Sequence, residues 1–134
     1  MEDIYNGNFI IIDDDPINNL ICSKFIRKVC PSSSIKTFTQ PKEGTDFVLD
    51  PESTDTTIKN ILLLDINMPT TSGWDVLDTL MSRPDFSKHQ YSIYMLSSSI
   101  ATDDRNRANT HPLVSGFLEK PLTIAIIQKL ITEQ

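Results

Sequence analysis

Residues 61–69 read Ile-Leu-Leu-Leu-Asp-Ile-Asn-Met-Pro. Four aliphatic residues in succession are typical of a strand that is covered on both faces, as in a parallel sheet. The strand ends at Asp65. Because a buried carboxylate is unfavourable unless a nearby group uses its charge, Asp65 predicts a functional site at the carboxyl end of this strand.

Three other apolar runs, at 9–12, 93–96 and 117–119, also end in side chains that can do chemistry. They are followed, in chain order, by Asp13-Asp14-Asp15, Ser97-Ser98-Ser99 and Lys120-Pro121. In an open parallel sheet the carboxyl ends of the strands meet at one edge, where ligands bind. We therefore expect the acids, the serines and the lysine to form one site with Asp65.

Short apolar runs alternate with helix-like periods along the chain, which indicates βα units and a parallel sheet. Strands are predicted at 9–12, 35–38, 61–64, 93–96 and 117–119, each followed by a helix. This pattern favours an α/β fold with a three-layer, doubly wound five-stranded parallel sheet, because a closed barrel needs about 250 residues. We expect a single domain over 1–134, with its core at about 8–132.

The helix predicted after the first strand has a recognisable cap and an apolar stripe. Asp15 is expected to cap it, with Pro16 in its first turn. Cys22 and Cys30 would lie about 12 Å apart along this helix, which is too far for a disulfide, so both are predicted to pack in the core. The apolar stripe of the helix is predicted to be Ile17, Leu20, Ile21, Cys22, Phe25 and Val29.

Composition excludes several classes of protein. The chain has twelve basic and eighteen acidic residues and a net charge of −6, which argues against a nucleic-acid interface. No apolar run approaches the roughly 18 residues that span a bilayer, and the polar start of the chain lacks a signal peptide's apolar segment. We expect a cytoplasmic protein that binds neither nucleic acid nor a membrane.

The acids at the strand ends predict a cation site. Close carboxylates repel one another, and a hard cation such as Mg²⁺ relieves the repulsion by taking oxygen ligands. Asp14 and Asp65 are predicted to bind Mg²⁺ directly, Asp13 through water, and Asn67 through its backbone carbonyl. Asp65 is also a candidate nucleophile toward a phosphoryl group, whose charge Mg²⁺, the Lys120 ammonium and a hydroxyl would neutralise.

Each fragment has a purely structural interpretation. An Asp-Asp-Asp-Pro run is most often a helix cap with solvated acids, and a serine run is most often a turn with local backbone bonds. The functional interpretation rests on their conjunction, since the acids, the hydroxyl and the lysine follow strands one, three, four and five of the predicted sheet.

Taken together, these residues resemble the receiver domain of two-component response regulators over almost the whole chain. The resemblance rests on Ile-Asp-Asp-Asp-Pro at 12–16, Leu-Asp-Ile-Asn-Met-Pro at 64–69, Gly73, Leu-Ser-Ser-Ser at 96–99 and Lys-Pro at 120–121. It implies a flavodoxin-like strand order, 2-1-3-4-5, and a cis peptide bond between Lys120 and Pro121.

The resemblance also implies a phosphorelay switch. A sensor histidine kinase or a phosphotransfer protein would donate a phosphoryl group to Asp65 with Mg²⁺ bound. Ser97 would then move toward the phosphate and Phe117 would rotate inward. These movements would reshape the face made by helix four, strand five and helix five, through which a downstream protein would bind.

Two departures from the family pattern leave alternatives open. A serine stands where threonine is commoner, and the connection between strands four and five is about one residue longer than usual. Ser98 is therefore an alternative to Ser97 as the switch hydroxyl, and the extra length is expected near 109–112. Because Gln134 leaves no room for an output domain, the chain is either a stand-alone receiver or a fragment of a longer protein.

Two other functions compete with the phosphorelay switch. A phosphatase with an aspartyl nucleophile is disfavoured, because Asn67 stands where such enzymes carry a second acid. A receiver fold that works as an interaction module without phosphorylation stays possible. We expect no enzymatic activity beyond self-phosphorylation and autodephosphorylation, with Asn67 and Ser99 flanking the route of the attacking water.

Overall fold

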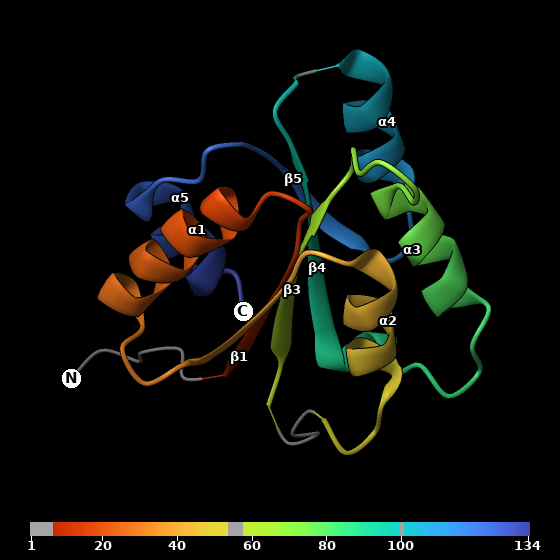
Figure 1. The fold of residues 1–134 in the computed structure, drawn as a ribbon, viewed down its shortest axis with the longest axis horizontal. Helices are drawn as coiled ribbons and strands as arrows, with labels where there is room; N and C mark the ends of the chain where they lie inside the picture. Colours follow the sequence, from red (N-terminus) through yellow and green to blue (C-terminus); the bar gives the residue numbers. More distant parts are fainter. Residues whose placement is uncertain (1–6, 54–57, 100) are drawn as a thin grey trace.

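The structure is a computed structural model that describes residues 7–53, 58–99 and 101–134. Strands and helices alternate throughout (Figure 1). The strands are β1 (Asn8–Ile12), β2 (Ser34–Phe38), β3 (Asn60–Asp65), β4 (Tyr91–Ser97) and β5 (Val114–Glu119). The helices are α1 (Pro16–Val29), α2 (Pro41–Leu49), α3 (Gly73–Met81), α4 (Thr102–Thr110) and α5 (Ile124–Thr132), with a short 3-10 turn at Lys88–Gln90.

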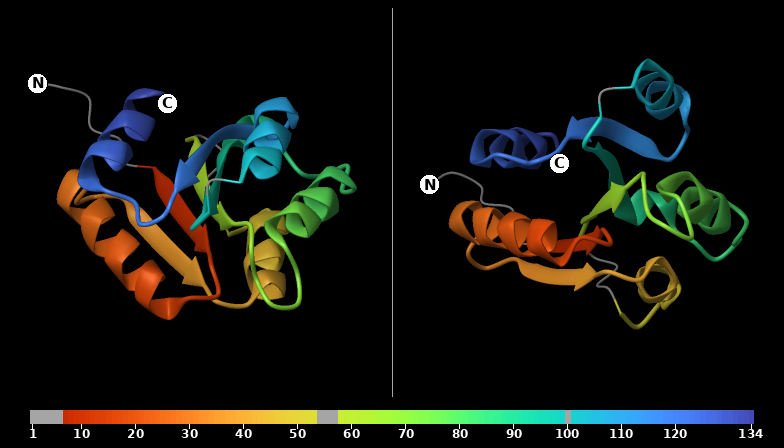
Figure 2. Two further views of the ribbon diagram at one scale, coloured as in Figure 1. Left: turned by 90° about the horizontal axis from the view of Figure 1, so that it is seen from above. Right: turned by 45° about the horizontal axis from the view of Figure 1, so that its top comes forward.

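The five strands form one parallel sheet in the order β2-β1-β3-β4-β5. This confirms the predicted fold class and strand order. Helices α1 and α5 cover one face of the sheet, and α2, α3 and α4 cover the other (Figures 1 and 2). The order reverses beside β1, so β1 and β3 are neighbours and Asp13 and Asp65 leave the sheet at the same edge.

Each face of the sheet has its own apolar core. Alternate residues of the central strands point to opposite faces, since the side-chain period of a strand is two. Ile10 and Leu62 belong to the core under α2, α3 and α4, whereas Ile11 and Leu63 belong to the core under α1 and α5. All six residues of β3 are buried, as its continuous apolar run predicts.

Helix α1 differs from the prediction. Asp15 caps it, and the Asp15 side chain accepts from the backbone N–H groups of Ile17 and Asn18, as expected. However, Ile17, Leu20 and Ile21 are 67%, 56% and 40% exposed. The buried positions of α1 are Asn19, Cys22 and Ile26. The predicted stripe was therefore wrong at three positions, because the helix turns Asn19 inward to hydrogen-bond the carbonyl of Asp13.

The pairing of β4 with β5 is irregular. Ile93 pairs with Val114 and Tyr94 pairs with Gly116, so the pairing of β4 with β5 skips Ser115. An extra residue in one strand of a pair is a β-bulge. The irregularity lies inside β5. Within the ranges that the structure describes, no helix is long and apolar enough to cross a bilayer.

Candidate functional site

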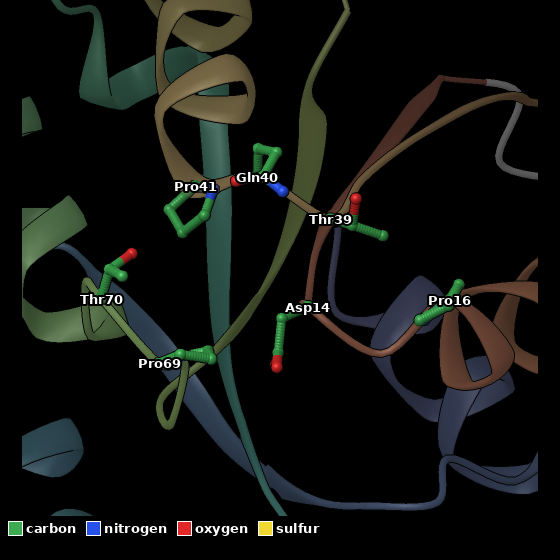
Figure 3. Close-up of a pocket in the computed structure, with 7 residues that line it drawn as sticks. All are labelled: Asp14, Pro16, Thr39, Gln40, Pro41, Pro69 and Thr70. Carbon is green, nitrogen blue, oxygen red and sulfur yellow. The ribbon is translucent and has the colours of Figure 1, made fainter.

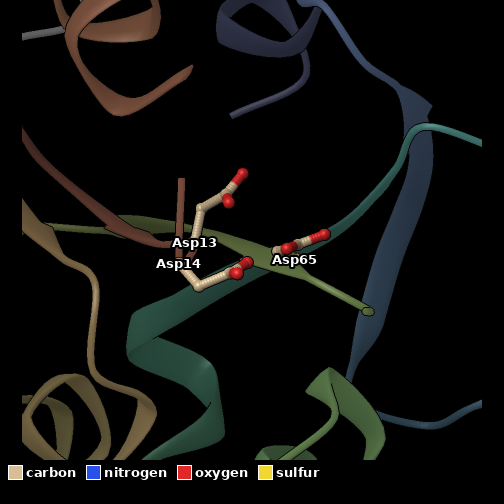
Figure 4. Close-up of side chains that lie close together, drawn as sticks. All are labelled: Asp13, Asp14 and Asp65. Carbon is tan, nitrogen blue, oxygen red and sulfur yellow. The ribbon is translucent and has the colours of Figure 1, made fainter. Parts of the chain in front are cut away.

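Three carboxylates gather at the edge where β1 and β3 end. One oxygen from each of Asp13, Asp14 and Asp65 lies within 4.8 Å of the others. Asp14 reaches toward Asp65 from the loop after β1, as Figure 4 shows. Asp13 and Asp65 are buried, and Asp14 is half-buried. The predicted acids are therefore brought together, with Asp14 as the most accessible of the three.

Lys120 joins this cluster from the end of β5. Its ammonium lies 3.0 Å from Oδ2 of Asp13 and 3.3 Å from Oδ1 of Asp65. Burial lowers the pKa of Lys120, but its hydrogen bond and attraction to Asp13, together with Asp65, outweigh burial and raise the pKa overall. The lysine is thus a fixed positive charge between two buried carboxylates. The peptide bond from Lys120 to Pro121 is cis, as the resemblance implied.

Asp65 has an unusual acidity in this environment. Burial, followed by the negative charge of Asp13, raises the pKa of Asp65 to about 7, although Lys120 opposes the shift. A carboxyl group with its pKa this high is under electrostatic strain that a nearby cation relieves. Three convergent carboxylates are also the oxygen donors that Mg²⁺ prefers. The residues present therefore fit a magnesium ion.

Asp13 is held by several donors. Its Oδ1 accepts from the backbone N–H of Asp15 at 2.9 Å, and its Oδ2 accepts from the Asn18 side chain at 2.8 Å and from Lys120. Its backbone carbonyl accepts from the Asn19 side chain at 3.0 Å. Sequence reasoning missed both asparagines. Their signal was two polar residues in the first turns of α1, directly after the acids.

The serines after β4 have different environments. Ser97 is completely buried at the end of the strand, and its Oγ accepts from the backbone N–H of Ser99 at 3.0 Å. The residue before it, Leu96, pairs with Asp65 across the sheet. Ser98 is exposed beyond the strand end. Of the two candidate hydroxyls, only that of Ser97 comes from within β4.

The loop between β3 and α3 closes tightly over the strand end. Asn67 is exposed in this loop, whereas the N–H of Gly73 donates to the carbonyl of Ile66 at 2.8 Å. A Cβ atom at position 73 would lie 2.5 Å from the carbonyl oxygen of Asp65. Only glycine therefore allows α3 to begin so close to the candidate phosphorylation site.

An open pocket of about 520 Å³ adjoins the acidic cluster (Figure 3). Its wall comes from the starts of α1 and α2 and from the loop after β3, and Asp14 projects into it (Figure 3). The lining residues are Asp14, Pro16, Thr39, Gln40, Pro41, Pro69 and Thr70. The acidic cluster is therefore open to solvent on the side of Asp14.

Phe117 lies on β5 and pairs with Met95 of β4. It is half-buried and packs against the core under α2, α3 and α4. The Arg105 guanidinium of α4 lies 4.9 Å from the centre of its ring. Trp74 of α3 contacts α4 through Asp104 and Arg107.

Comparison with known proteins identifies the family. The family described as "Response regulator receiver domain" matches residues 9–132. No curated protein sequence matches the chain.

Solved receiver structures share the fold. A two-component response regulator from Cytophaga hutchinsonii is 24% identical, with a TM-score of 0.82 over 96% of this chain and 97% of that one. A response regulator receiver protein from Dyadobacter fermentans is also 24% identical, with a TM-score of 0.80 over 94% and 95% of the two chains.

A third similar structure is a co-crystal of the Saccharomyces cerevisiae histidine phosphotransfer protein Ypd1 with the receiver domain of its downstream response regulator Ssk1. The match is 21% identical, with a TM-score of 0.75 over 98% of this chain and 90% of the other. Since the family match covers nearly the whole chain, the protein belongs to the response regulator receiver domain family of two-component signalling.

Proposed function

We propose that this receiver accepts a phosphoryl group on Asp65 from a phosphohistidine of a sensor histidine kinase or a phosphotransfer protein. One observation carries the proposal: Asp65 ends a buried strand with Asp13 and Asp14 within 4.8 Å, and with the Lys120 ammonium 3.3 Å from its Oδ1. That combination supplies a nucleophile, a cation site and a fixed positive charge at one point.

The transfer step converts one phosphoryl bond into another. A carboxylate oxygen of Asp65 attacks phosphorus, the new O–P bond forms and the N–P bond to the donor imidazole breaks. The leaving ring nitrogen keeps the bonding electron pair and takes a proton from solvent. Asp65 must be ionised to attack, and a bound cation would favour the ionised form against the burial and the Asp13 charge that raise its pKa.

The remaining site residues would neutralise the charge of the phosphoryl oxygens. Mg²⁺, when bound, supplies electrostatic stabilisation of the transferring group. Asp14 and Asp65 are proposed as direct ligands, with Asp13 binding through water and Asn67 through its backbone carbonyl. Lys120 already contacts Asp65 and is proposed to hydrogen-bond a phosphoryl oxygen.

The proposed output is a change in the α4–β5–α5 face. Ser97 would exchange its bond with the Ser99 N–H for a bond to the phosphoryl group, and Phe117 would rotate inward. Two features support this route. Ser97 follows the residue that pairs with Asp65, and Phe117 pairs with Met95 two residues earlier on β4. A downstream protein would read the rearranged face.

The surroundings of the pocket support a protein as the donor. Ile17, Leu20 and Ile21 expose apolar surface on α1, and Pro16 at the start of this helix lines the pocket beside Asp14. Large apolar side chains on a surface are typical of protein contacts. The similar structure that contains a phosphotransfer protein is consistent with such a donor. The receiver would act on itself and on no other substrate.

Intact mass spectrometry tests the proposal. The chain is incubated with acetyl phosphate and Mg²⁺, and the native form is compared with Asp65→Asn. One added phosphoryl group that is lost in Asp65→Asn, or when Mg²⁺ is chelated, is expected. Beryllofluoride binding is measured on the same samples, because rapid hydrolysis can hide the adduct. Failure of both would contradict the proposal and favour an interaction module that works without phosphorylation.

A further inference from the structure

We infer that Asn18 is a positioning residue for the magnesium site: its neutral side-chain amide anchors the buried Asp13 carboxylate. The inference rests on the proposed function, since it concerns the same acids. Three contacts carry it. Oδ2 of Asp13 accepts from Asn18 at 2.8 Å and from Lys120 at 3.0 Å, and Oδ1 accepts from the Asp15 N–H at 2.9 Å.

Burial makes these donors necessary. Asp13 is completely buried, and a buried charge is costly unless it is hydrogen-bonded. Two of its three donors, the Asp15 N–H and the Asn18 amide, come from the chain that follows β1 into α1. These two hold the carboxylate from the α1 side, while Lys120 reaches it from the residue after β5.

The neutrality of Asn18 sets it apart from Lys120. An ammonium beside a carboxylate cancels the negative charge that attracts a cation, and it also repels the cation directly. An amide donor orients the carboxylate while leaving its full negative charge in place. Asn18 therefore holds Asp13 in a form that can still bind Mg²⁺ through water.

The arrangement also allows Lys120 to serve a second partner. Lys120 bridges Asp13 and Asp65, and the proposed function requires its ammonium to turn toward a phosphoryl oxygen. If Lys120 were the sole side-chain donor to Asp13, that turn would leave the carboxylate loosely held. Asn18 keeps Asp13 oriented when Lys120 turns. Groups that orient metal-binding residues typically change metal affinity about 10–100-fold when removed.

Calorimetric titration with Mg²⁺ alone tests the inference on the full chain. Asn18→Leu has nearly the same size and lacks the donor, and Asn18→Ala serves if the leucine variant folds poorly. Asn106→Leu is the matched control, because Asn106 is an exposed helical asparagine on α4. We expect the Mg²⁺ dissociation constant to rise about tenfold in both Asn18 variants and to stay at the native value in Asn106→Leu.

Two further measurements distinguish positioning from a general structural effect. The Tm in EDTA reports stability without metal, and a loss there with an unchanged dissociation constant would overturn the inference. The effect of Asn18→Leu on the dissociation constant is also expected to be larger in a Lys120→Met background, since both residues donate to one oxygen of Asp13. Additive effects would contradict this.

The outcomes separate the inference from the proposed function. If the native chain binds Mg²⁺ and both Asn18 variants bind it within twofold of the native constant, the inference alone fails. If the native chain does not bind Mg²⁺, the proposed function fails first, and the role of Asn18 falls with it.

Discussion

The indole Nε1 of Trp74 donates a hydrogen bond to Oδ1 of Asp104 at 3.2 Å, which joins the first turn of α3 to the first turn of α4. The Arg107 guanidinium lies 4.5 Å from the centre of the same indole. Helix α4 has a single buried residue, Ala108. Polar and cation–π contacts with Trp74 therefore contribute a share of what holds α4 in place.

Replacing Asp104 tests how much its hydrogen bond with Trp74 contributes to holding α4 in place. Asp104→Ala removes the acceptor for the indole, and Asp103→Ala is the control, because Asp103 is the exposed neighbour in the same turn. A hydrogen bond of this kind contributes about 1 kcal/mol, so amide hydrogen exchange in α4 is expected to be roughly fivefold faster in Asp104→Ala alone. Equal exchange rates in the two variants would contradict the assignment.

The raised pKa of Asp65 makes stability depend on pH. The pKa is about 7 in the folded chain and about 3.9 in an unfolded one. Between these values the folded state binds more protons than the unfolded state, so Asp65 destabilises the metal-free protein as pH rises from about 4 to 7. Asp65→Asn lacks this titration.

The Tm advantage of Asp65→Asn over the native chain is therefore expected to grow between pH 4 and 7, reaching on the order of 10–15 °C, and then level off. Thermal unfolding in EDTA measures it, with the exposed-site variant Asp103→Asn as control. A Tm difference that stays constant from pH 4 to 8 would be inconsistent with the proposed titration.

The Lys120 ammonium compensates the negative charges of two buried carboxylates, those of Asp13 and Asp65. Lys120→Met keeps much of the side-chain volume but leaves Asp13 and Asp65 without their common cation, and breaking a buried pair costs about 3 kcal/mol. Denaturant unfolding at pH 8 should show this loss. Adding Asp65→Asn should recover part of it, because one of the two uncompensated charges is then absent. If the two substitutions are simply additive, the ion-pair account is wrong.

Gly73 is expected to matter for the site as well as for stability. In Gly73→Ala the new methyl group would lie 2.5 Å from the Asp65 carbonyl oxygen, so the strand end or the helix must shift. Gly116→Ala is a milder control in another strand, since its nearest contact is the Tyr94 ring at 3.0 Å. Calorimetry should show weaker Mg²⁺ binding in Gly73→Ala and native binding in Gly116→Ala; equal Mg²⁺ affinities would refute the site-specific effect.

The strands and their polar ends could be predicted because a strand that is buried on both faces has a simple sequence pattern. A central parallel strand such as β3 reads as an unbroken apolar run, and its first charged residue marks the edge of the sheet. Asp65 follows this rule at the end of β3, and Asp13 follows it after β1. The conjunction of such ends, rather than any single motif, made the candidate site predictable from the sequence.

Periodicity failed where side chains serve purposes other than core packing. Ile17 and Leu20 fit a helical apolar stripe, yet they are exposed. The polar Asn19 is buried instead, and its side chain donates a hydrogen bond to the backbone carbonyl of Asp13. A pattern of apolar residues does not distinguish a face that packs inward from a face that is left for a partner. The bulge at Ser115 was equally invisible, because it depends on pairing with β4.

The most direct test of the central claim locates the phosphoryl group on the chain. After phosphorylation with acetyl phosphate and Mg²⁺, borohydride reduces an aspartyl phosphate to homoserine and releases inorganic phosphate, and peptide mass spectrometry then finds the altered residue. Homoserine at position 65 alone is the predicted result. Homoserine at position 13 or 14, with an unmodified Asp65, would contradict the assignment of Asp65 as the phosphoryl acceptor.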